Sequence, residues 1–285
     1  MTKAHVTDDG ARLVLAFNAD QSHASRQRLA IVDVVETASL WRLCWTLAWL
    51  DIRLRYRGSM LGPLWLTLST GLMVAAMGAI YSSILHIPAR DYVPYLALSL
   101  VLWNFLSVLV TDSCHGYTLA EGMIRTMRMP YSLYAARIVL RNVFVLAHNI
   151  VVVIAVDLVL WRWPGPVAVL ALPAMVLWLA DALAVAILLG ALCARFRDIP
   201  PIATSVLQMA FMVSAVIFRP ELLGGQQWLL AFNPFFTVLD VLRAPLMGEV
   251  PRWDSYVSAV CFSAVLCLAA WTLFVRVRGR IAFWV

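Results

Sequence analysis

Three arginines at alternate positions, Arg53, Arg55 and Arg57, are the side chains of this sequence whose type and spacing most directly suggest a chemistry. An arginine guanidinium can donate two parallel hydrogen bonds to phosphate oxygens, so this arginine collar could bind the pyrophosphate of a lipid-linked molecule. The alternative is that the collar only anchors the orientation of the chain, through attraction to anionic lipids. Both interpretations require a membrane next to the collar.

The sequence that follows the collar has the composition of a membrane span. Leu64–Leu85 contains no charged side chain, and a helix of that length crosses the hydrocarbon core of a bilayer, which is about 30 Å thick. Across the chain, 62% of residues are hydrophobic and 13% are charged, about half the charged share of a soluble domain. Because a water-soluble fold could not cover its surface with so few charges, the sequence predicts an all-α, polytopic membrane protein.

Apolar runs predict six transmembrane helices, and arginines in the loops predict their orientation. The predicted spans are Leu64–Leu85, Val93–Thr111, Asn142–Leu160, Val167–Cys193, Ile202–Phe218 and Tyr256–Val275. Twelve arginines fall in one set of loops, and five fall in the opposite set: Arg90, Arg162, Arg219, Arg243 and Arg252. Since basic residues mark the cytoplasmic side, both termini are predicted to be cytoplasmic.

Two further segments are predicted to lie in the membrane without crossing it. Leu40–Tyr56 carries leucines at helical spacing flanked by tryptophans, which is typical of an amphipathic helix in the cytoplasmic interface. Pro220–Asp254 is largely apolar but is interrupted by Asn233-Pro234 and Ala244-Pro245. This segment is too short to cross and return, so it predicts two half-helices that re-enter from the outer face.

Aromatic side chains recur in or near the predicted spans. Sugar rings stack their C–H faces on aromatic rings, so these side chains could line a conduit for a polysaccharide. The alternative is ordinary packing or the aromatic belt at the membrane interface. The candidates are Tyr81, Trp103, Phe105, Trp178, Phe211 and Phe218.

Three ionisable residues, His148, Asp157 and Asp181, lie inside predicted spans. Such groups are costly in a bilayer and are often functional. A proton relay would need regular spacing on facing helices, whereas His148 and Asp157 are nine residues apart on one helix. Hydrogen bonding between helices and contact with a wet cavity are the alternatives.

Several function classes are excluded or unsupported. The only lysine is Lys3, so the chain has no P-loop, and ATP-driven activity would need another polypeptide. The sequence contains no G-x-S-x-G or H-E-x-x-H motif and no metal-ligand spacing of cysteines, which predicts no catalytic and no metal site. Its basic residues flank apolar spans instead of forming a nucleic-acid-binding face.

Four separated motifs resemble the permease subunits of type-2 ABC exporters, in the branch that exports O-antigen, capsular polysaccharide and teichoic acid. The motifs are RYRGSMLGPLWLTL (Arg55–Leu68), ARFRDIPPIATSVLQMAFMVSAVIF (Ala194–Phe218), LLAFNPFFTVLDVLRAPLMG (Leu229–Gly248) and RGRIAFWV (Arg278–Val285). The resemblance covers residues 36–285, which it identifies as a type-2 transmembrane domain. Residues 1–35 fall outside it and are predicted to form a polar cytoplasmic tail.

The resemblance implies a transport subunit without a catalytic site, in a bacterial inner membrane. Two copies would form a homodimer with two ABC ATPase subunits, which would bind ATP and Mg. The channel between the copies would carry a glycan linked to undecaprenyl diphosphate. This chain itself would need no cofactor.

The resemblance also implies roles for particular segments. The loop 112–130 would hold a coupling helix that contacts the ATPase, the loop 194–201 would make a second contact, and the re-entrant pair would form an external gate. The implied coupling residues are Glu121, Met123, Arg125, Arg197 and Asp198. The implied gate residues are Trp228, Phe232, Phe235 and Phe236.

Two other functions remain open from the sequence. The same architecture would suit a type-2 exporter of a drug or a small lipid. An integral-membrane transferase acting on lipid-linked sugars is the other alternative. The transferase would need a functional acid or base and no partner, whereas either exporter would need an ATPase.

Overall fold

Five helices of the computed structural model are long and apolar enough to cross a membrane, within the described residues 23–60, 62 and 64–285. Each overlaps a predicted span. They are α3 (Leu64–Ile84), α4 (Ala89–Cys114), α6 (Tyr131–Val159), α7 (Ala171–Arg195, preceded by the 3₁₀ turn η1, Pro166–Leu170) and α10 (Trp253–Val277). The described part of the chain contains helices and no strand, so the predicted all-α class and the multi-pass membrane protein are confirmed.

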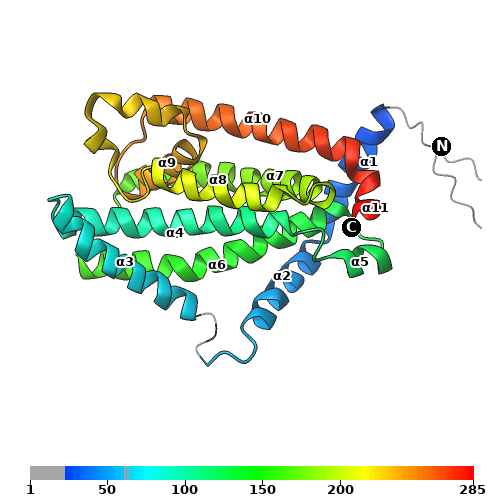
Figure 1. Ribbon diagram of the computed structural model, residues 1–285, viewed down its shortest axis with the longest axis horizontal. Coiled ribbons are helices and arrows are strands. Elements are labelled where there is room, and N and C mark those ends of the chain that lie inside the picture. The colour runs from blue at the N-terminus through cyan, green and yellow to red at the C-terminus, as the bar shows by residue number, and fades with distance from the viewer. Residues whose placement is uncertain (1–22, 61, 63) are drawn as a thin grey trace, which may run out of the picture.

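Helix α4 lies at the centre of the bundle, against α3, α6 and α7 (Figure 1). Its apolar residues run around all faces of the helix, which is the pattern of a helix surrounded by protein. Tyr92, Leu96, Val101 and Leu102 are almost fully buried. The helix therefore supplies the core against which the others pack.

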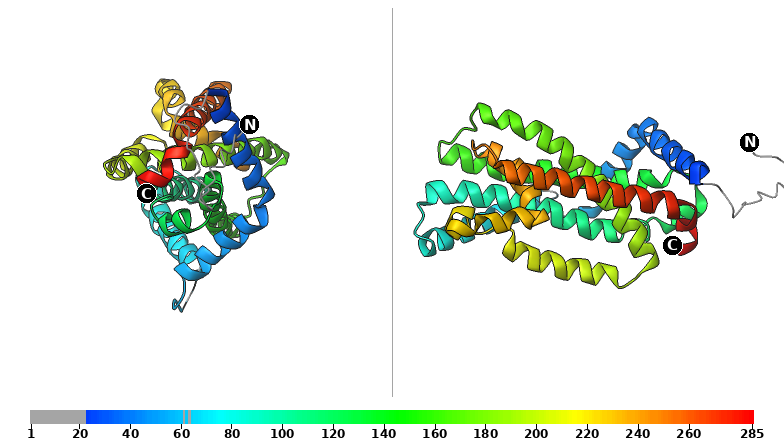
Figure 2. Two further views of the ribbon diagram at one scale, coloured as in Figure 1. Left: turned by 90° about the vertical axis from the view of Figure 1, so that its right-hand side faces the viewer. Right: turned by 90° about the horizontal axis from the view of Figure 1, so that it is seen from above.

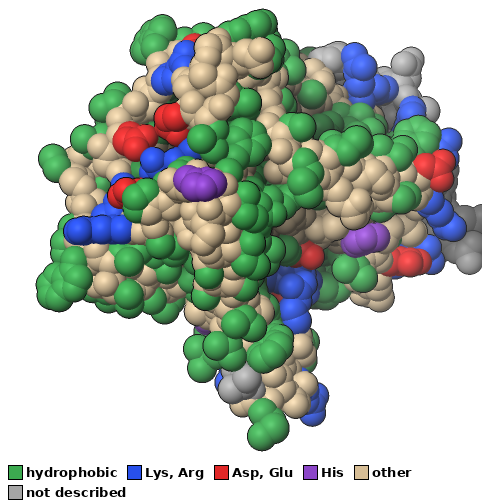
Figure 3. Space-filling model, turned by 60° about the vertical axis from the view of Figure 1, so that its left-hand side comes forward, with side chains coloured by type: hydrophobic (Ala, Val, Ile, Leu, Met, Phe, Trp, Pro, Cys, Tyr) green, Lys and Arg blue, Asp and Glu red, His purple; other side chains and the backbone are tan. Residues whose placement is uncertain are grey.

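The spanning helices alternate in direction, so their connections collect at two ends of the molecule (Figure 1, Figure 2). One end holds the C-terminal segment, the loop 115–130 and the loop 195–198, which are rich in arginine. The other end holds the short connections after α3 and α6 and the segment between α8 and α10. Charged side chains of both signs lie at the ends, and the surface between is mostly hydrophobic or uncharged (Figure 3).

The predicted fifth span, Ile202–Phe218, is only partly helical. Helix α8 (Ile199–Val213) has 15 residues, about 22 Å of helix, which is shorter than the hydrocarbon core. The apolar run continues beyond it, but Ala215 has a positive φ of 46°, which an α-helix cannot accommodate. The backbone after Val213 instead receives side-chain hydrogen bonds from α4, as described below.

The segment predicted to re-enter the membrane is bent. The 3₁₀ segment η2 (Pro220–Phe232) and α9 (Pro234–Leu246) meet at 112°, the geometry of a broken span or a re-entrant loop. Asn233 begins α9 because its Oδ1 accepts hydrogen bonds from the backbone N–H groups of Phe235 and Phe236, at 3.0 and 3.2 Å. Since α8 ends and α10 begins at the same end of the bundle, the arrangement suits the predicted pair of half-helices (Figure 1).

Two helices precede the first span. Helix α2 (Trp41–Arg55) matches the predicted amphipathic helix, and Trp45 and Trp49 pack edge-on against Phe144 of α6, with ring centroids 4.6 and 5.7 Å apart. Helix α1 (His23–Ser39) begins inside the stretch assigned to a polar tail, and residues 1–22 of that tail lie outside the described residues. The short helices α5 (Glu121–Thr126), η3 (Arg278–Arg280) and α11 (Ile281–Trp284) complete the fold.

The buried carboxylate of Asp33 fixes α1 to the rest of the molecule. Its oxygens accept hydrogen bonds from the backbone N–H groups of Tyr131 and Ser132, at 3.1 and 2.9 Å, and from the Ser132 hydroxyl at 2.6 Å. Arg278 pairs with the same carboxylate at 2.7 Å. Asp33 thus caps the exposed N–H groups at the beginning of α6 and joins both terminal segments to it.

Candidate functional site

A groove of about 730 Å³ opens between α3, α4 and α8. The α4 residues that line it run from Leu100 to Thr111, about 17 Å of helix. Positions 100, 104, 107, 108 and 111 fall on one face of a helix, since they repeat at intervals of three and four. The polar residues in the groove are Ser69, Thr70, Asn104, Ser107, Thr111, Thr204 and Gln208.

The polar side chains of the groove carry hydrogen-bonding groups without charge. The hydroxyls of Ser69, Ser107 and Thr204 donate to backbone carbonyls of their own helices, at 2.9, 3.2 and 3.1 Å, so their oxygens can still accept. Among the described residues, the amides of Asn104 and Gln208 have no hydrogen-bond partner. The groove therefore offers donors and acceptors at the depth of the membrane spans.

Arg55 is the only charged residue among the described residues that form the wall of the groove, and it lies at the arginine-rich end. Its guanidinium is 3.7 Å from the carboxylate of Asp112, and its side chain is 42% exposed. Asp112 also pairs with Arg141 at 2.7 Å and accepts a hydrogen bond from Asn142 at 3.0 Å. Because Asp112 is already neutralised by Arg141, the charge of Arg55 remains available to an anion.

This ionic cluster continues toward α2 and α5. Asp51 of α2 accepts a hydrogen bond from Arg137 of α6 at 2.8 Å and lies 3.6 Å from Arg141. Arg137 also donates to the sulfur of Met123 on α5, at 3.3 Å. The mouth of the groove and the α5 helix are therefore joined by one set of charged side chains.

The other two arginines of the collar lie elsewhere. Arg53 and Arg57 are exposed and do not line the groove. Alternate positions share a face on a strand but lie 200° apart around an α-helix, and Arg53 and Arg55 both belong to α2. The helix separates the guanidinium groups that the sequence suggested as a set.

The six candidate aromatics also separate. Trp103 and Phe211 line the groove, with ring centroids 5.6 Å apart. Phe105 and Trp178 are buried and stacked on each other at 5.4 Å, away from the groove. Tyr81 packs at the edge of the main core, and Phe218 packs beside Ala215 and Leu230.

The predicted coupling residues lie together at the arginine-rich end. Glu121 and Arg125 form the expected i,i+4 ion pair at 2.7 Å, and Arg125 also donates to the carbonyl of Val285 at 2.8 Å. Arg197 and Asp198 are exposed in the loop between α7 and α8. The surface that these residues form stays a prediction for the ATPase contact.

The connection before α5 packs closely on α7. A Cβ at Gly190 would lie 2.9 Å from the ring of Tyr117, so glycine is required for this approach. Complete burial raises the pKa of Tyr117, which keeps its hydroxyl neutral. The position of the loop is thus fixed by packing against the spanning helices.

The four predicted gate residues occupy three environments. Trp228 and Phe232 are exposed and pack edge-to-face, with centroids 6.0 Å apart. Phe235 lies 5.9 Å from Trp103, and Phe236 is buried. Their role in a gate remains a prediction.

Sequence reasoning missed the buried contacts of Arg243, which it counted with the outer loops. This side chain is 2% exposed and donates to the Tyr95 hydroxyl, the Ser99 hydroxyl and the carbonyl of Ala215, at 2.7, 3.1 and 2.8 Å. It also pairs with Asp240 at 3.0 Å. The i,i+3 spacing of Asp240 and Arg243 in an apolar helix was the available signal.

Two tyrosines of α4 complete this attachment. Tyr92 donates to the carbonyl of Ile217 at 2.6 Å, and Tyr95 donates to the carbonyls of Ala215 and Phe218 at 2.6 and 3.0 Å. These bonds satisfy backbone groups that the end of α8 leaves without helical partners. The segment after α8 and helix α9 are therefore both fastened to α4.

The three ionisable residues inside the spans have separate partners. Nδ1 of His148 is 2.7 Å from the carbonyl oxygen of Phe144 on its own helix. Asp181 of α7 accepts a hydrogen bond from Ser263 of α10 at 2.7 Å, which fits the interpretation of bonding between helices. Asp157 lies near the end of α6, and no hydrogen bond joins the three side chains.

The residues of this chain that match a known family include all those that line the groove. The family model described as ABC-2 type transporter matches residues 42–247. The chain is 21% identical over 236 residues to the O-antigen export system permease protein RfbA of Myxococcus xanthus. The aligned region covers 81% of this chain and 91% of the relative. A relative of the same name from Klebsiella pneumoniae is 20% identical over 235 residues, covering 81% and 90%.

Proposed function

Because this chain belongs to the ABC-2 type transporter family, we propose that it is the permease of an ATP-driven exporter of lipid-linked polysaccharide. The name of these relatives, O-antigen export system permease protein, supports O-antigen or a similar polymer as the cargo. The membrane would be the bacterial inner membrane, with both termini in the cytoplasm, as the arginine distribution favours.

The groove between α3, α4 and α8 is the observation that carries this proposal. Sugar hydroxyls both donate and accept hydrogen bonds, which matches the uncharged amides and hydroxyls of its wall. Trp103 and Phe211 add ring faces on which sugars can stack. Because the groove is open on one side, two copies of the chain facing each other would close it into a channel, which supports a homodimer.

The two ends of the groove support a direction of transport. Arg55 would bind the diphosphate of an undecaprenyl-linked glycan as it enters from the cytoplasmic leaflet. In the homodimer, the α5 surface of each copy would contact one of two ATPase subunits, which would bind ATP and Mg. The cluster around Asp51 and Asp112 would link that surface to Arg55. The η2–α9 pair would form the outer gate.

The proposal is tested by measuring glycan-stimulated ATP hydrolysis and export by the permease co-purified with its ATPase. Asn104→Leu and Gln208→Leu each remove amide hydrogen bonds to the glycan, and each should lower the export rate about 2- to 10-fold. Ser205→Leu is the control: Ser205 lies on α8, as Gln208 does, but outside the groove, so this variant should leave export unchanged. Stimulation by amphipathic drugs and none by a glycan lipid would contradict the polysaccharide assignment.

The arginine collar gives a sharper test, since the structure separates its members. Arg55→Lys keeps the charge but loses the fork that matches a diphosphate, so the half-saturating concentration of lipid-linked glycan should rise about 3- to 10-fold. Arg53→Lys and Arg57→Lys should overlay the parent curve, because neither residue lines the groove. If all three curves overlay the parent, the collar serves only as a topology anchor.

A further inference from the structure

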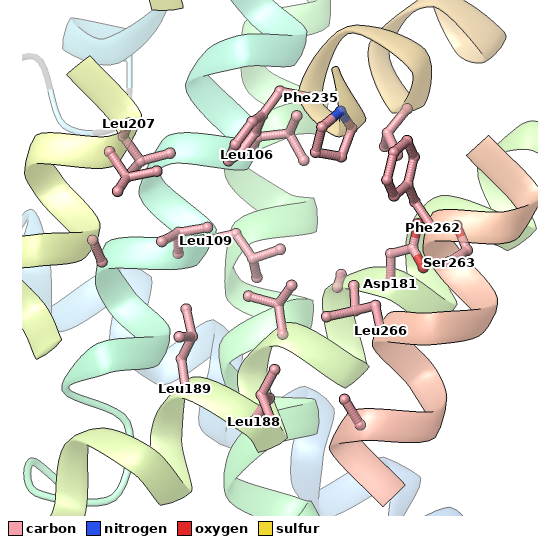
Figure 4. A pocket seen from close by; sticks show the side chains of 18 of the residues that line it. Leu106, Leu109, Asp181, Leu188, Leu189, Leu207, Phe235, Phe262, Ser263 and Leu266 are labelled. Atoms are coloured by element: carbon pink, nitrogen blue, oxygen red, sulfur yellow. Dashed lines mark hydrogen bonds between the residues drawn. The ribbon is translucent and has the colours of Figure 1, made fainter. Parts of the chain in front are cut away.

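A second hollow lies on the other side of α8, between α7, α9 and α10 (Figure 4). Its volume is about 580 Å³, within the range of small-molecule sites. Leucines and phenylalanines such as Leu109, Leu188, Phe235 and Phe262 form most of its wall, at the depth of the membrane spans. The proposed glycan path does not use this hollow.

One acidic side chain stands in this apolar wall. Asp181 is 93% buried, since its exposed fraction is 7%, and its Oδ2 accepts a hydrogen bond from Ser263 at 2.7 Å. Its other oxygen, Oδ1, is buried and has no hydrogen-bond partner among the described residues. The third polar side chain of the wall, Trp178, donates to the carbonyl of Val238 at 2.6 Å and therefore gives no hydrogen bond to Oδ1 of Asp181.

Among the described residues that line the hollow, none offers a positive charge to an ionised Asp181 carboxylate. No lysine, arginine or histidine in the part of the chain that the structure describes lines the hollow. An unpaired acceptor in a low-dielectric interior is costly, and an uncompensated carboxylate at membrane depth is more so. The bond to Ser263 satisfies one oxygen and supplies no positive charge. A ligand with a cationic donor and an apolar body would complement both features of the hollow.

We propose that the hollow is a binding site for a lipophilic ammonium compound. The hydrocarbon or aromatic part of the ligand fills the apolar space, and its protonated amine donates to Oδ1 of Asp181. The compound enters from the bilayer between α8 and α10, where Ile202 and Val265 are 58% and 66% exposed. Leu207 of α8 lines both this hollow and the polar groove, so the ligand would contact the face of α8 opposite the groove.

Binding is measured with the purified protein in nanodiscs of zwitterionic lipid, using a dansyl-labelled alkylamine and its N-acetylated, uncharged counterpart. The parent should bind the amine about tenfold more tightly than the acetylated probe. Asp181→Asn keeps the shape of the side chain, and it should remove this preference without changing the affinity for the acetylated probe. Asp157→Asn, the same carboxyl change near the end of α6 and outside the hollow, is the control and should retain the preference.

Ala203→Trp places an indole in the hollow and should abolish saturable binding of both probes, which separates site binding from partition into the lipid. Equal affinity of the parent for the two probes would overturn the proposal. A preference for the amine that survives in Asp181→Asn would overturn it as well. Neither readout depends on glycan export, so failure of the proposed function leaves this test intact.

Discussion

Replacing Arg243 with alanine should lower the free energy of unfolding by about 3–5 kcal/mol, because it removes one partner of a buried ion pair. Asp240 would lose its cation, and the hydroxyls of Tyr95 and Ser99 would lose a charged donor. Arg243→Lys should recover only part of the loss, since an ammonium with three donors cannot serve four acceptors in the geometry of a guanidinium. Unfolding of the purified protein in detergent measures both changes.

Arg252→Ala is the matched control, because Arg252 pairs with Asp254 at 2.7 Å but is 53% exposed. An exposed pair contributes about 0–1 kcal/mol, so this variant should unfold almost as the parent does. If Arg243→Ala and Arg252→Ala had equal small effects, the buried network would not hold the outer segment in place.

Asp33→Ala should have an effect of similar size at the opposite end of the molecule. It leaves Arg278 without its carboxylate and removes the cap from the first N–H groups of α6, a combined loss of about 3–5 kcal/mol. The α1 helix should also detach, since its buried acidic anchor is gone. Limited proteolysis should then cut α1 and the C-terminal segment faster, while the spanning helices stay protected.

Glu36→Ala controls for charge and helix propensity, because Glu36 is exposed on the same helix. It should leave both the unfolding midpoint and the proteolysis rate unchanged. Unaltered proteolysis of Asp33→Ala would contradict the role of Asp33 as the anchor of α1.

The spanning helices were predictable because their signal is local. A run of about 20 apolar residues fixes the existence and approximate ends of α3, α4, α7 and α10 without reference to the rest of the chain. The Asn-Pro pair at 233–234 likewise marks the beginning of α9, since asparagine caps a helix and proline fits its first turn. These features depend on neighbours in sequence.

The early end of α8 was not predictable for the opposite reason. The sequence from Val213 to Phe218 is apolar except for Ser214 and has no glycine or proline. The helix ends because the carbonyls of Ala215, Ile217 and Phe218 accept hydrogen bonds from Tyr92 and Tyr95, more than 100 residues away. Contacts at such separation leave no local pattern.

The candidate site was predictable in part. Trp103 and Phe211 were named from the sequence because large aromatic residues are conspicuous in apolar spans. The row of Asn104, Ser107 and Thr111 was missed although it repeats at helical spacing, since small polar residues are common in membrane helices. The collar was predicted as one set of three arginines, but alternate positions lie on different sides of a helix, so only Arg55 lines the groove.

Helix α4 carries contacts of both ends of the molecule on one continuous element. Asp112, next to Arg55, lies in its last turn, and Tyr92 and Tyr95, which hold the outer segment, lie near its beginning. Its 26 residues extend about 39 Å, so a tilt of this helix about its middle would displace the two ends of the groove in opposite directions. In the proposed exporter, a rigid tilt of α4 would therefore close one end of the groove as it opened the other.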